Sequence, residues 1–296
     1  MFFFRDNAPL LFPLCSAILY ALGGIALKAA GDGGISNTRA AFVCNALSAF
    51  AFAFLYPWHN AIIPSPFWPV LALAALFVAG QICTIKAFAT GEVSEVTPVF
   101  GVKVVIVSFL VAFVIGNPLS LQTWIGAVLS VAGITLLQMN DRKQSGKSRL
   151  KPMLFAFLAA GSFAGFDAMT QYWSPKFGFG NFVPPAMLLA AGLSFAFLPG
   201  AGSSQPVASR TRFYLYIGAA LFSLQAILLI RSIGTYGNAA EANVIYSSRG
   251  LWGISLVWLV GTWFGNRELK GRHPRIIFSR IAGAISISIA TLLIVF

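Results

Sequence analysis

The sequence predicts an all-α integral membrane protein with ten transmembrane helices in two inverted five-helix repeats. Three observations predict it: the composition, the length of the apolar runs, and the likeness of the two halves. Of the 296 residues, 58% are hydrophobic and only 9% are charged, whereas a soluble domain carries about 25% charged residues. So few polar side chains cannot cover a water-soluble globule, and the chain is therefore expected to lie in a lipid bilayer.

The apolar runs favour helices over a β-barrel. A bilayer offers no partner for unpaired backbone groups, so only helices or closed barrels can span it. Barrel strands alternate polar and apolar residues, and the runs in this chain are continuous. A helical span needs about 20 apolar residues. Ten segments meet this requirement approximately: 9–30, 36–56, 67–89, 94–116, 121–139, 151–173, 181–199, 212–235, 240–264 and 276–295.

Similar residues recur at a nearly constant distance along the chain. A glycine, a glutamate and a base recur 146 residues apart, as Gly91, Glu95 and Lys103, then Gly237, Glu241 and Arg249. This offset predicts a first repeat over 1–140, a basic linker over 141–150 and a second repeat over 151–296. Five spans are an odd number, so the second repeat must enter the membrane from the opposite side. The repeats are therefore expected to be inverted.

The basic residues predict how the chain is oriented. The formal net charge is +12, and eleven of the twenty basic residues lie in the stretches 142–151, 210–212 and 267–275. These stretches fall in loops on one side of the membrane. The positive-inside rule makes that side cytoplasmic and puts both termini outside, in a plasma membrane of the bacterial inner-membrane type. Nucleic acid is not expected as a partner, because aromatic and basic residues do not interleave outside the spans.

Lys103 and Arg249 are the leading candidates for a binding site. Each lies about nine residues into its span, or roughly 13 Å deep at 1.5 Å per residue, near the middle of a hydrocarbon core of roughly 30 Å. A cation at this depth costs about 2.5–3.5 kcal/mol on insertion scales. Either could bind the anionic group of a small-molecule substrate, or could pair with carbonyl groups or a neighbouring acid. Arg249 offers a planar fork that suits carboxylate or phosphate.

The acidic residues leave more than one interpretation open. Asp167 lies well inside the sixth span, where it could bind an amine, carry a coupling proton, or act as the counter-ion of Lys103 or Arg249. Glu95 and Glu241 lie near the starts of their helices, where an acid complements the helix dipole. A role for these glutamates in proton coupling or gating is the alternative.

Several uncharged polar and aromatic residues complete the candidate site. Gln81 and Gln225 fall mid-span, 144 residues apart, and could orient a substrate or bond helices together. Asn243 and Tyr246 share a helix face with Arg249 by their spacing. The predicted substrate-binding residues are Arg249, Lys103, Gln81, Gln225, Tyr246, Asn243, Asp167 and Trp252.

Enzymatic chemistry, a cofactor and a metal site are not expected. The two histidines, His59 and His273, fall in predicted loops on opposite sides of the membrane. The three cysteines lie in apolar runs without metal-ligand spacing. No nucleophile–base pair or phosphate-binding loop occurs in the sequence.

One stretch resembles a known family. Thr97-Pro98-Val99-Phe100, an apolar span, Gly116, then residues 119–126 and Gly133-Ile134 resemble the EamA-type repeat of the drug/metabolite transporter superfamily. In the second half, Val244-Ile245-Tyr246 replaces the Thr-Pro-Val position, and Arg267-Glu268-Leu269 matches the turn before the last span only in part.

The resemblance implies a secondary carrier for small metabolites, with its site between the halves and, commonly, cytoplasmic termini. We expect a small polar metabolite, an amino acid or related organic anion or zwitterion, to be exported by alternating access. A carrier of sugar phosphates or nucleotide sugars is one alternative, and a non-transporting membrane scaffold is another. The oligomeric state is left open.

Overall fold

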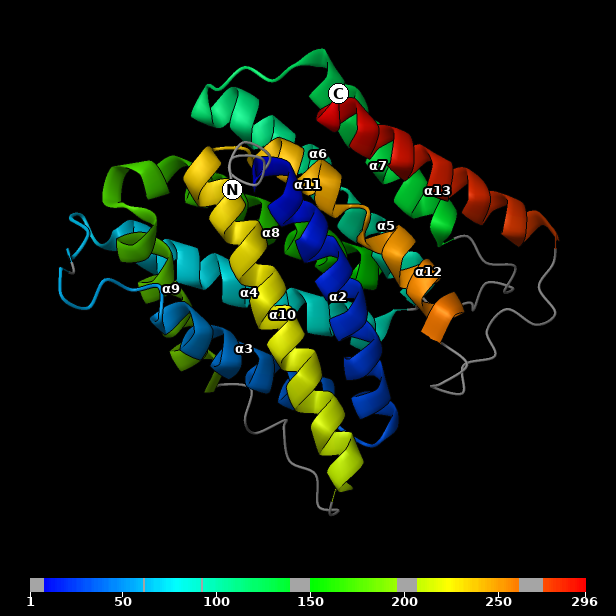
Figure 1. Cartoon of the computed structure of the whole chain (residues 1–296), viewed down its shortest axis with the longest axis horizontal. Coiled ribbons are helices and arrows are strands. Elements are labelled where there is room, and N and C mark those ends of the chain that lie inside the picture. The colour runs from blue at the N-terminus through cyan, green and yellow to red at the C-terminus, as the bar shows by residue number, and fades with distance from the viewer. Residues whose placement is uncertain (1–7, 61, 92, 139–149, 196–206, 261–273) are drawn as a thin grey trace. The chain divides into compact units, whose positions relative to one another are not determined.

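The computed structural model describes residues 8–60, 62–91, 93–138, 150–195, 207–260 and 274–296. Within these residues the chain is helical, with connecting turns and no strand (Figure 1). The linker predicted over 141–150 and the basic residues from 267 to 273 lie almost wholly outside them.

Each of the ten predicted spans corresponds to one helix or to one interrupted helix, so the all-helical prediction is confirmed for the described chain. In the first half these are α2 (Ala8–Asp32), α3 (Asn37–Ala53), α4 (Trp68–Thr90), α5 (Val93–Gly101), α6 (Lys103–Phe109), the π-helix η1 (Leu110–Ile115) and α7 (Leu121–Leu137). In the second half they are α8 (Leu150–Phe177), α9 (Phe179–Leu193), α10 (Ser209–Tyr236), α11 (Ala239–Tyr246), α12 (Arg249–Val260) and α13 (Pro274–Val295).

Six of these segments are long and apolar enough to cross a bilayer by length and composition alone. They are α2, α4, Val96–Ile115, α8, α10 and Phe278–Val295. Two shorter helices, α7 and α9, are also apolar. The described chain is therefore that of a multi-pass membrane protein.

Local signals in the sequence set several helix ends. Ser36 and Ser120 cap α3 and α7, because each side-chain oxygen accepts a hydrogen bond from the backbone N–H three residues later, at 3.3 and 3.1 Å. Gly237 ends α10 with a left-handed φ of 67°, which glycine adopts at little cost. Gly91, which corresponds to Gly237 in the predicted 146-residue repeat, has a different structural role. A Cβ there would lie 2.4 Å from Pro152, so this glycine permits α4 and α8 to approach closely.

The chain forms two compact units, and each draws on both halves of the sequence. The first unit comprises Met1–Val78 and Met169–Asn238. Within it, α2 packs along α10, where a Cβ on Gly23 would lie 2.5 Å from Phe222 and one on Gly218 would lie 2.9 Å from Leu27. Small residues of this kind let helix backbones approach in a membrane, where dispersion contacts hold helices together.

A proline in α2 explains a polar contact inside the first unit. Pro13 lacks an N–H, so the carbonyl of Pro9 loses its usual helical partner. Asn238 donates to this carbonyl at 3.1 Å and Ser232 donates to it at 3.2 Å. Both donors come from the other half of the sequence, at and just beyond the end of α10.

The second unit comprises Ala79–Ala168 and Ala239–Phe296. In this unit α7 packs extensively against α13. A Cβ on Gly133 would lie 2.5 Å from Ile287, and a Cβ on Gly283 would lie 2.7 Å from the carbonyl oxygen of Gly133. Ser286 adds a hydrogen bond to the carbonyl of Leu129 at 2.8 Å. This unit contains the interrupted helices α5–α6 and α11–α12.

Candidate functional site

Two helices of the second unit are interrupted at positions 146 residues apart, the offset of the predicted repeat. α5 and α11 begin at Val93 and Ala239, and α6 and α12 begin at Lys103 and Arg249. Both pairs are 146 residues apart, which is the offset that the sequence predicts. The fourth and ninth predicted spans are therefore each interrupted by a turn, which the sequence interpretation did not include. In each half, the helix restarts at the cation.

The backbone tightens at both interruptions. The N–H of Val102 bonds to the carbonyl of Val99 at 3.2 Å, and that of Ser248 bonds to the carbonyl of Ile245 at 3.1 Å. These bonds reach back three residues instead of four, as in a 3₁₀ turn. The turn at the second break comprises Ser247 and Ser248. Such irregular backbone is tolerated at membrane depth when protein groups satisfy it.

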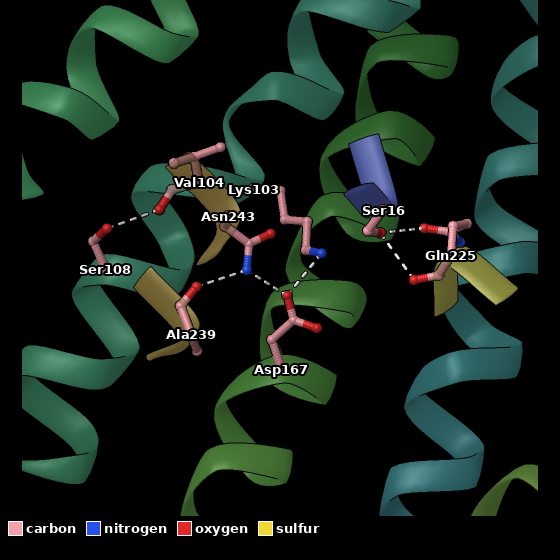
Figure 2. Close-up of polar contacts among 8 residues, drawn as sticks. All are labelled: Ser16, Lys103, Val104, Ser108, Asp167, Gln225, Ala239 and Asn243. Atoms are coloured by element: carbon pink, nitrogen blue, oxygen red, sulfur yellow. Dashed lines mark hydrogen bonds and ion pairs between the residues drawn. The ribbon is translucent and has the colours of Figure 1, made fainter. Parts of the chain in front are cut away.

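The first cation belongs to a polar triad (Figure 2). The Nζ of Lys103 lies 2.8 Å from Oδ2 of Asp167, and the side chains are 15% and 4% exposed. The Nδ2 of Asn243 donates to the same carboxylate oxygen at 2.7 Å and to the carbonyl of Ala239 at 2.8 Å. Asp167 is therefore the counter-ion of Lys103, one of the roles that the sequence left open. Three helices, α6, α8 and α11, each contribute one member.

The triad is held together by strong interactions that come at a high desolvation cost. Removing two charges from water costs several kcal/mol per ion, and a good geometry with further hydrogen bonds is needed to offset this. The second donor, Asn243, supplies such a bond, and bonds to a charged group contribute about 1.5–3 kcal/mol. The ion pair carries no net charge, so the first break is electrically neutral while the triad is intact.

The second cation has a different environment. The guanidinium carbon of Arg249 lies 4.5 Å from the centroid of the Tyr246 ring. Tyr246 is buried, with 6% of its surface exposed, while Arg249 is partly buried. A cation over an aromatic face is stabilised by about 0.5–1 kcal/mol at exposed sites and more when desolvated. Ser248, which precedes Arg249, is buried, and its Oγ has no hydrogen-bond partner within the described residues.

Hydroxyl groups of α7 attach α11 to the rest of this unit. Ser247 donates to the carbonyl of Val244 at 2.6 Å, and its Oγ lies 3.0 Å from the Oγ of Ser130. At the start of α11, Thr123 donates to Oε1 of Glu241 at 3.3 Å. Glu241 lies in the first turn of its helix, as the helix-start interpretation expects. The side chain of Glu95 lies outside the described residues.

Comparison with known proteins finds a family likeness in the first half of the chain. The sequence profile of the EamA-like transporter family matches residues 7–139. The match covers the first predicted repeat, in which the resembling motif is most complete. The search of curated proteins found no match.

Comparison with solved structures finds a similar fold over most of the chain. One crystal structure, titled only "Crystal structure of protein", is similar with a TM-score of 0.73 at 13% identity. The alignment covers 96% of this chain and 98% of the other. At this identity the likeness concerns the fold alone.

Of the eight predicted site residues, the structure brings five together in two groups. Lys103, Asp167 and Asn243 form the triad, and Arg249 stacks on Tyr246. The remaining three are Gln81, which is partly buried on α4, Trp252, which is partly buried in the first turn of α12, and Gln225, which belongs to the first unit.

Gln225 bonds two helices of the first unit together. The hydroxyl of Ser16 in α2 lies 2.9 Å from the backbone carbonyl of Gln225 and 3.0 Å from its Oε1 (Figure 2). A second hydroxyl contact joins α10 to α3, where the Oγ of Ser48 lies 3.0 Å from that of Ser223. These contacts match the helix-bonding role that the sequence left open for Gln225.

The sequence interpretation missed the serines at the second break. Ser247 and Ser248 lie between Tyr246 and Arg249 in a predicted span. Two consecutive hydroxyl residues can compete for backbone bonds and interrupt a helix. The serine pair itself is therefore a signal of the break. The partner of Ser247, Ser130, lies 117 residues away in the chain, and no local pattern indicates that contact. Within the described residues, no group of three or more His, Cys, Asp or Glu side chains could hold a metal ion.

Proposed function

We propose that this protein is a secondary carrier that moves a small polar metabolite across the membrane by alternating access. The substrate would be an amino acid or a related organic anion or zwitterion, and the direction would be export. One observation carries the proposal. Both interrupted helices restart at a cation, at positions 146 residues apart, and broken helices with charged groups are typical of substrate sites in transporters built from repeats.

Inverted repeats provide the mechanism. Five spans in each half would place the two repeats in opposite orientations, and exchange of their conformations would expose the site to each side in turn. The proposal keeps the basic loops cytoplasmic and the termini outside, in a plasma membrane of the bacterial inner-membrane type. Neither catalysis nor a cofactor is part of this mechanism.

The cations would have different roles in the proposed carrier. Arg249 is the better candidate for the anionic end of the substrate, because its guanidinium is a fixed fork and Lys103 already contacts Asp167 at 2.8 Å. Tyr246, Asn243, Gln81 and Trp252 would orient the rest of the substrate. Asp167 is the candidate for a coupling proton, since a proton on its carboxylate would remove the charge that holds Lys103.

Transport by the purified protein in liposomes tests the proposal. We would load proteoliposomes with a radiolabelled panel of L-amino acids, mono- and dicarboxylates and sugar phosphates, and measure exchange with the same unlabelled compound outside. The wild type should exchange at least one amino acid or carboxylate. Arg249→Ala should reduce that exchange at least tenfold, because a bond from a charged group contributes about 1.5–3 kcal/mol.

Ser162→Ala is the matched control for Arg249→Ala. Ser162 is on α8, and its hydroxyl bonds to the carbonyl of Leu158 in the same helix, at 2.8 Å. This variant should exchange like the wild type. Exchange by Arg249→Ala at the full rate would overturn the role of Arg249. No exchange of any panel compound by the wild type would overturn the proposed function.

Two alternatives make different predictions in this assay. A carrier of sugar phosphates or nucleotide sugars would also use mid-membrane cations, and phosphate esters, not amino acids, would then be the compounds exchanged. A non-transporting scaffold is favoured by the pairing of Lys103 with Asp167, because an internal ion pair needs no ligand. A scaffold would exchange none of the compounds.

A further inference from the structure

Helix α10 is long enough to reach both surfaces of a membrane. It has 28 residues from Ser209 to Tyr236, or about 42 Å at 1.5 Å per residue. A bilayer is about 40–45 Å thick with its headgroups, around a hydrocarbon core of roughly 30 Å. The first turn of α10 holds Arg210 and Arg212, and both side chains are exposed. These two arginines therefore lie at the depth of the lipid headgroups.

Aromatic side chains gather at the other end of α10. A Cβ on Gly234 would lie 2.7 Å from the ring of Phe179, which brings the end of α10 to the junction of α8 and α9. Near this junction Trp68 packs edge-on against Trp173, with ring centroids 5.6 Å apart. The ammonium of Lys176 lies 4.6 Å from the centroid of the Trp173 ring. Tryptophan is enriched at membrane–water interfaces, and here the cation already contacts an aromatic face.

The start of α10 packs against the turn between α2 and α3. A Cβ on Gly33 would lie 2.4 Å from the side chain of Thr211, and the buried cluster at this contact comprises Ala30, Ile35 and Leu215. The contact gathers four basic residues at one end of the first unit: Lys28, Arg39, Arg210 and Arg212. Asp32 is the single acid in the segments 28–43 and 207–216. This end of the unit therefore has an excess of positive charge.

Within the described part of the chain, neither arginine of α10 forms an ion pair. The Nε of Arg210 donates to the Tyr214 hydroxyl at 3.0 Å, and the guanidinium carbon lies 5.6 Å from the centroid of that ring. The Nη2 of Arg212 donates to the Oγ of Ser209 at 3.3 Å. Both partners are neutral, so these bonds orient the guanidinium groups and leave their charge in place. A guanidinium has five N–H donors, and a bidentate contact with a phosphate uses two of them.

An exposed apolar stripe begins where the arginines end. Phe213, Ile217 and Leu224 are 62%, 41% and 47% exposed, and their spacing of four and seven residues puts them on one face of the helix. Ser209 and Arg210 precede Phe213 by four and three residues, so they lie at the headgroup end of the same face. Cations above an apolar stripe match the two parts of an anionic phospholipid, its charged headgroup and its acyl chains.

We propose that this face of α10 binds anionic phospholipids of the membrane. The guanidinium groups of Arg210 and Arg212 contact the headgroup phosphates, and the acyl chains lie along Phe213, Ile217 and Leu224. An arginine near an anionic membrane surface strengthens the attraction about fivefold, so two favour an anionic lipid over a zwitterionic one by roughly 25-fold. The proposal goes beyond the carrier function and does not depend on it.

The experiment measures the melting temperature of the purified full chain in detergent with added lipid. Dioleoylphosphatidylglycerol and dioleoylphosphatidylcholine have the same acyl chains and differ in headgroup charge. At about a hundredfold the half-saturating amount, phosphatidylglycerol should raise the melting temperature by about 3–5 °C, and the same amount of phosphatidylcholine should raise it by less than about 1 °C. Replacing both arginines by glutamine should raise the half-saturating amount of phosphatidylglycerol about tenfold or more. Replacing both by lysine should change it by less than about threefold, because the charges remain.

Three controls separate this surface from general attraction between opposite charges. Lys176→Gln removes an exposed cation at the aromatic end of α10, and it should respond to phosphatidylglycerol like the wild type. Glycerol 3-phosphate, a headgroup phosphate without acyl chains, should not raise the melting temperature at the same concentration. Salt at about 1 M in place of about 0.1 M should weaken the response to phosphatidylglycerol, because the Debye length falls from about 10 to about 3 Å.

Each outcome decides the proposal. Equal responses to the two lipids, an unchanged response after both arginines are replaced by glutamine, or an equal loss in Lys176→Gln would overturn it. An equal effect of glycerol 3-phosphate would overturn the role of the apolar stripe and with it the proposal. If the double variant does not fold, Arg210→Gln and Arg212→Gln are measured singly, and an unchanged half-saturating amount in both would also overturn it. None of these readouts involves transport, so the carrier function is tested separately.

Discussion

Replacement of Asp167 by asparagine removes the charge that neutralises Lys103 inside the membrane. The ammonium lies 2.8 Å from the carboxylate, and the two side chains are 15% and 4% exposed, so water replaces the lost partner only in part. Removing one member of a buried ion pair costs about 3–5 kcal/mol. With an unfolding entropy of about 2.1 cal/mol/K per residue, this corresponds to a fall of roughly 5–8 °C in melting temperature for a chain of this length.

The double variant Lys103→Gln with Asp167→Asn isolates the charge from the shape. Both replacements are neutral, near the original size and able to hydrogen-bond to each other, and the amide oxygen introduced by Asp167→Asn can still accept from Asn243. We expect the double variant to melt within about 2 °C of the wild type, since replacing a whole buried pair is often nearly neutral. Either single variant should melt several degrees lower.

The assay is the thermal unfolding of the purified protein in detergent, followed by tryptophan fluorescence and by the fraction that remains monodisperse. The four proteins form a double-mutant cycle, so the coupling energy follows directly. A double variant as unstable as the single variants would refute the reasoning, because the effect would then come from shape or hydrogen bonding. An Asp167→Asn variant that melts like the wild type would refute it as well.

The remaining predictions concern a glycine, a serine pair and an amide. Gly237→Ala should lower the stability of the fold by about 1 kcal/mol, because φ is 67° at this position. Gly161→Ala should not lower it, because a Cβ on Gly161 meets nothing within 4 Å. Melting curves of the two variants make the comparison. Ser130→Ala and Ser247→Ala should be non-additive in a double-mutant cycle, because their hydroxyls are 3.0 Å apart, and additive energies would contradict that bond. Asn243→Ala should reduce the melting temperature by about 2–5 °C through loss of a bond to a charged group, and an unchanged melting temperature would show that the carboxylate is satisfied without it.

Much of the fold follows from periodicity and composition, because a bilayer leaves few alternatives for an apolar chain. The predicted span 67–89 is observed as Trp68–Thr90, and 121–139 as Leu121–Leu137. The breaks at Val102 and at the serine pair Ser247 and Ser248 were not predicted. The break at Val102 lies between apolar residues that give no sign of where the helical hydrogen bonds stop, whereas the serine pair at the second break is a signal that the interpretation did not use.

The candidate site was predictable in its members more than in its pairings. The depth of Lys103 and Arg249 in their spans marked them as unusual, and the spacing of Tyr246 from Arg249 indicated a contact. The partner of Asp167 could not be chosen from the sequence, since both cations lie far from it along the chain. What distinguishes Ser248 from the neighbouring Ser247 is the lack of a hydrogen-bond partner within the described residues, which only the structure reveals.

The composition of the two units has a consequence for how the chain is made. Each unit combines residues from both halves of the sequence, so neither is complete when the ribosome has produced the first half. The nascent first half must wait in the bilayer until α8 to α13 have been inserted. A chain cut within residues 139–149 would thus give two fragments, each holding an incomplete set of helices for both units. We expect such fragments to be degraded when expressed singly and to recover a stable protein when expressed together.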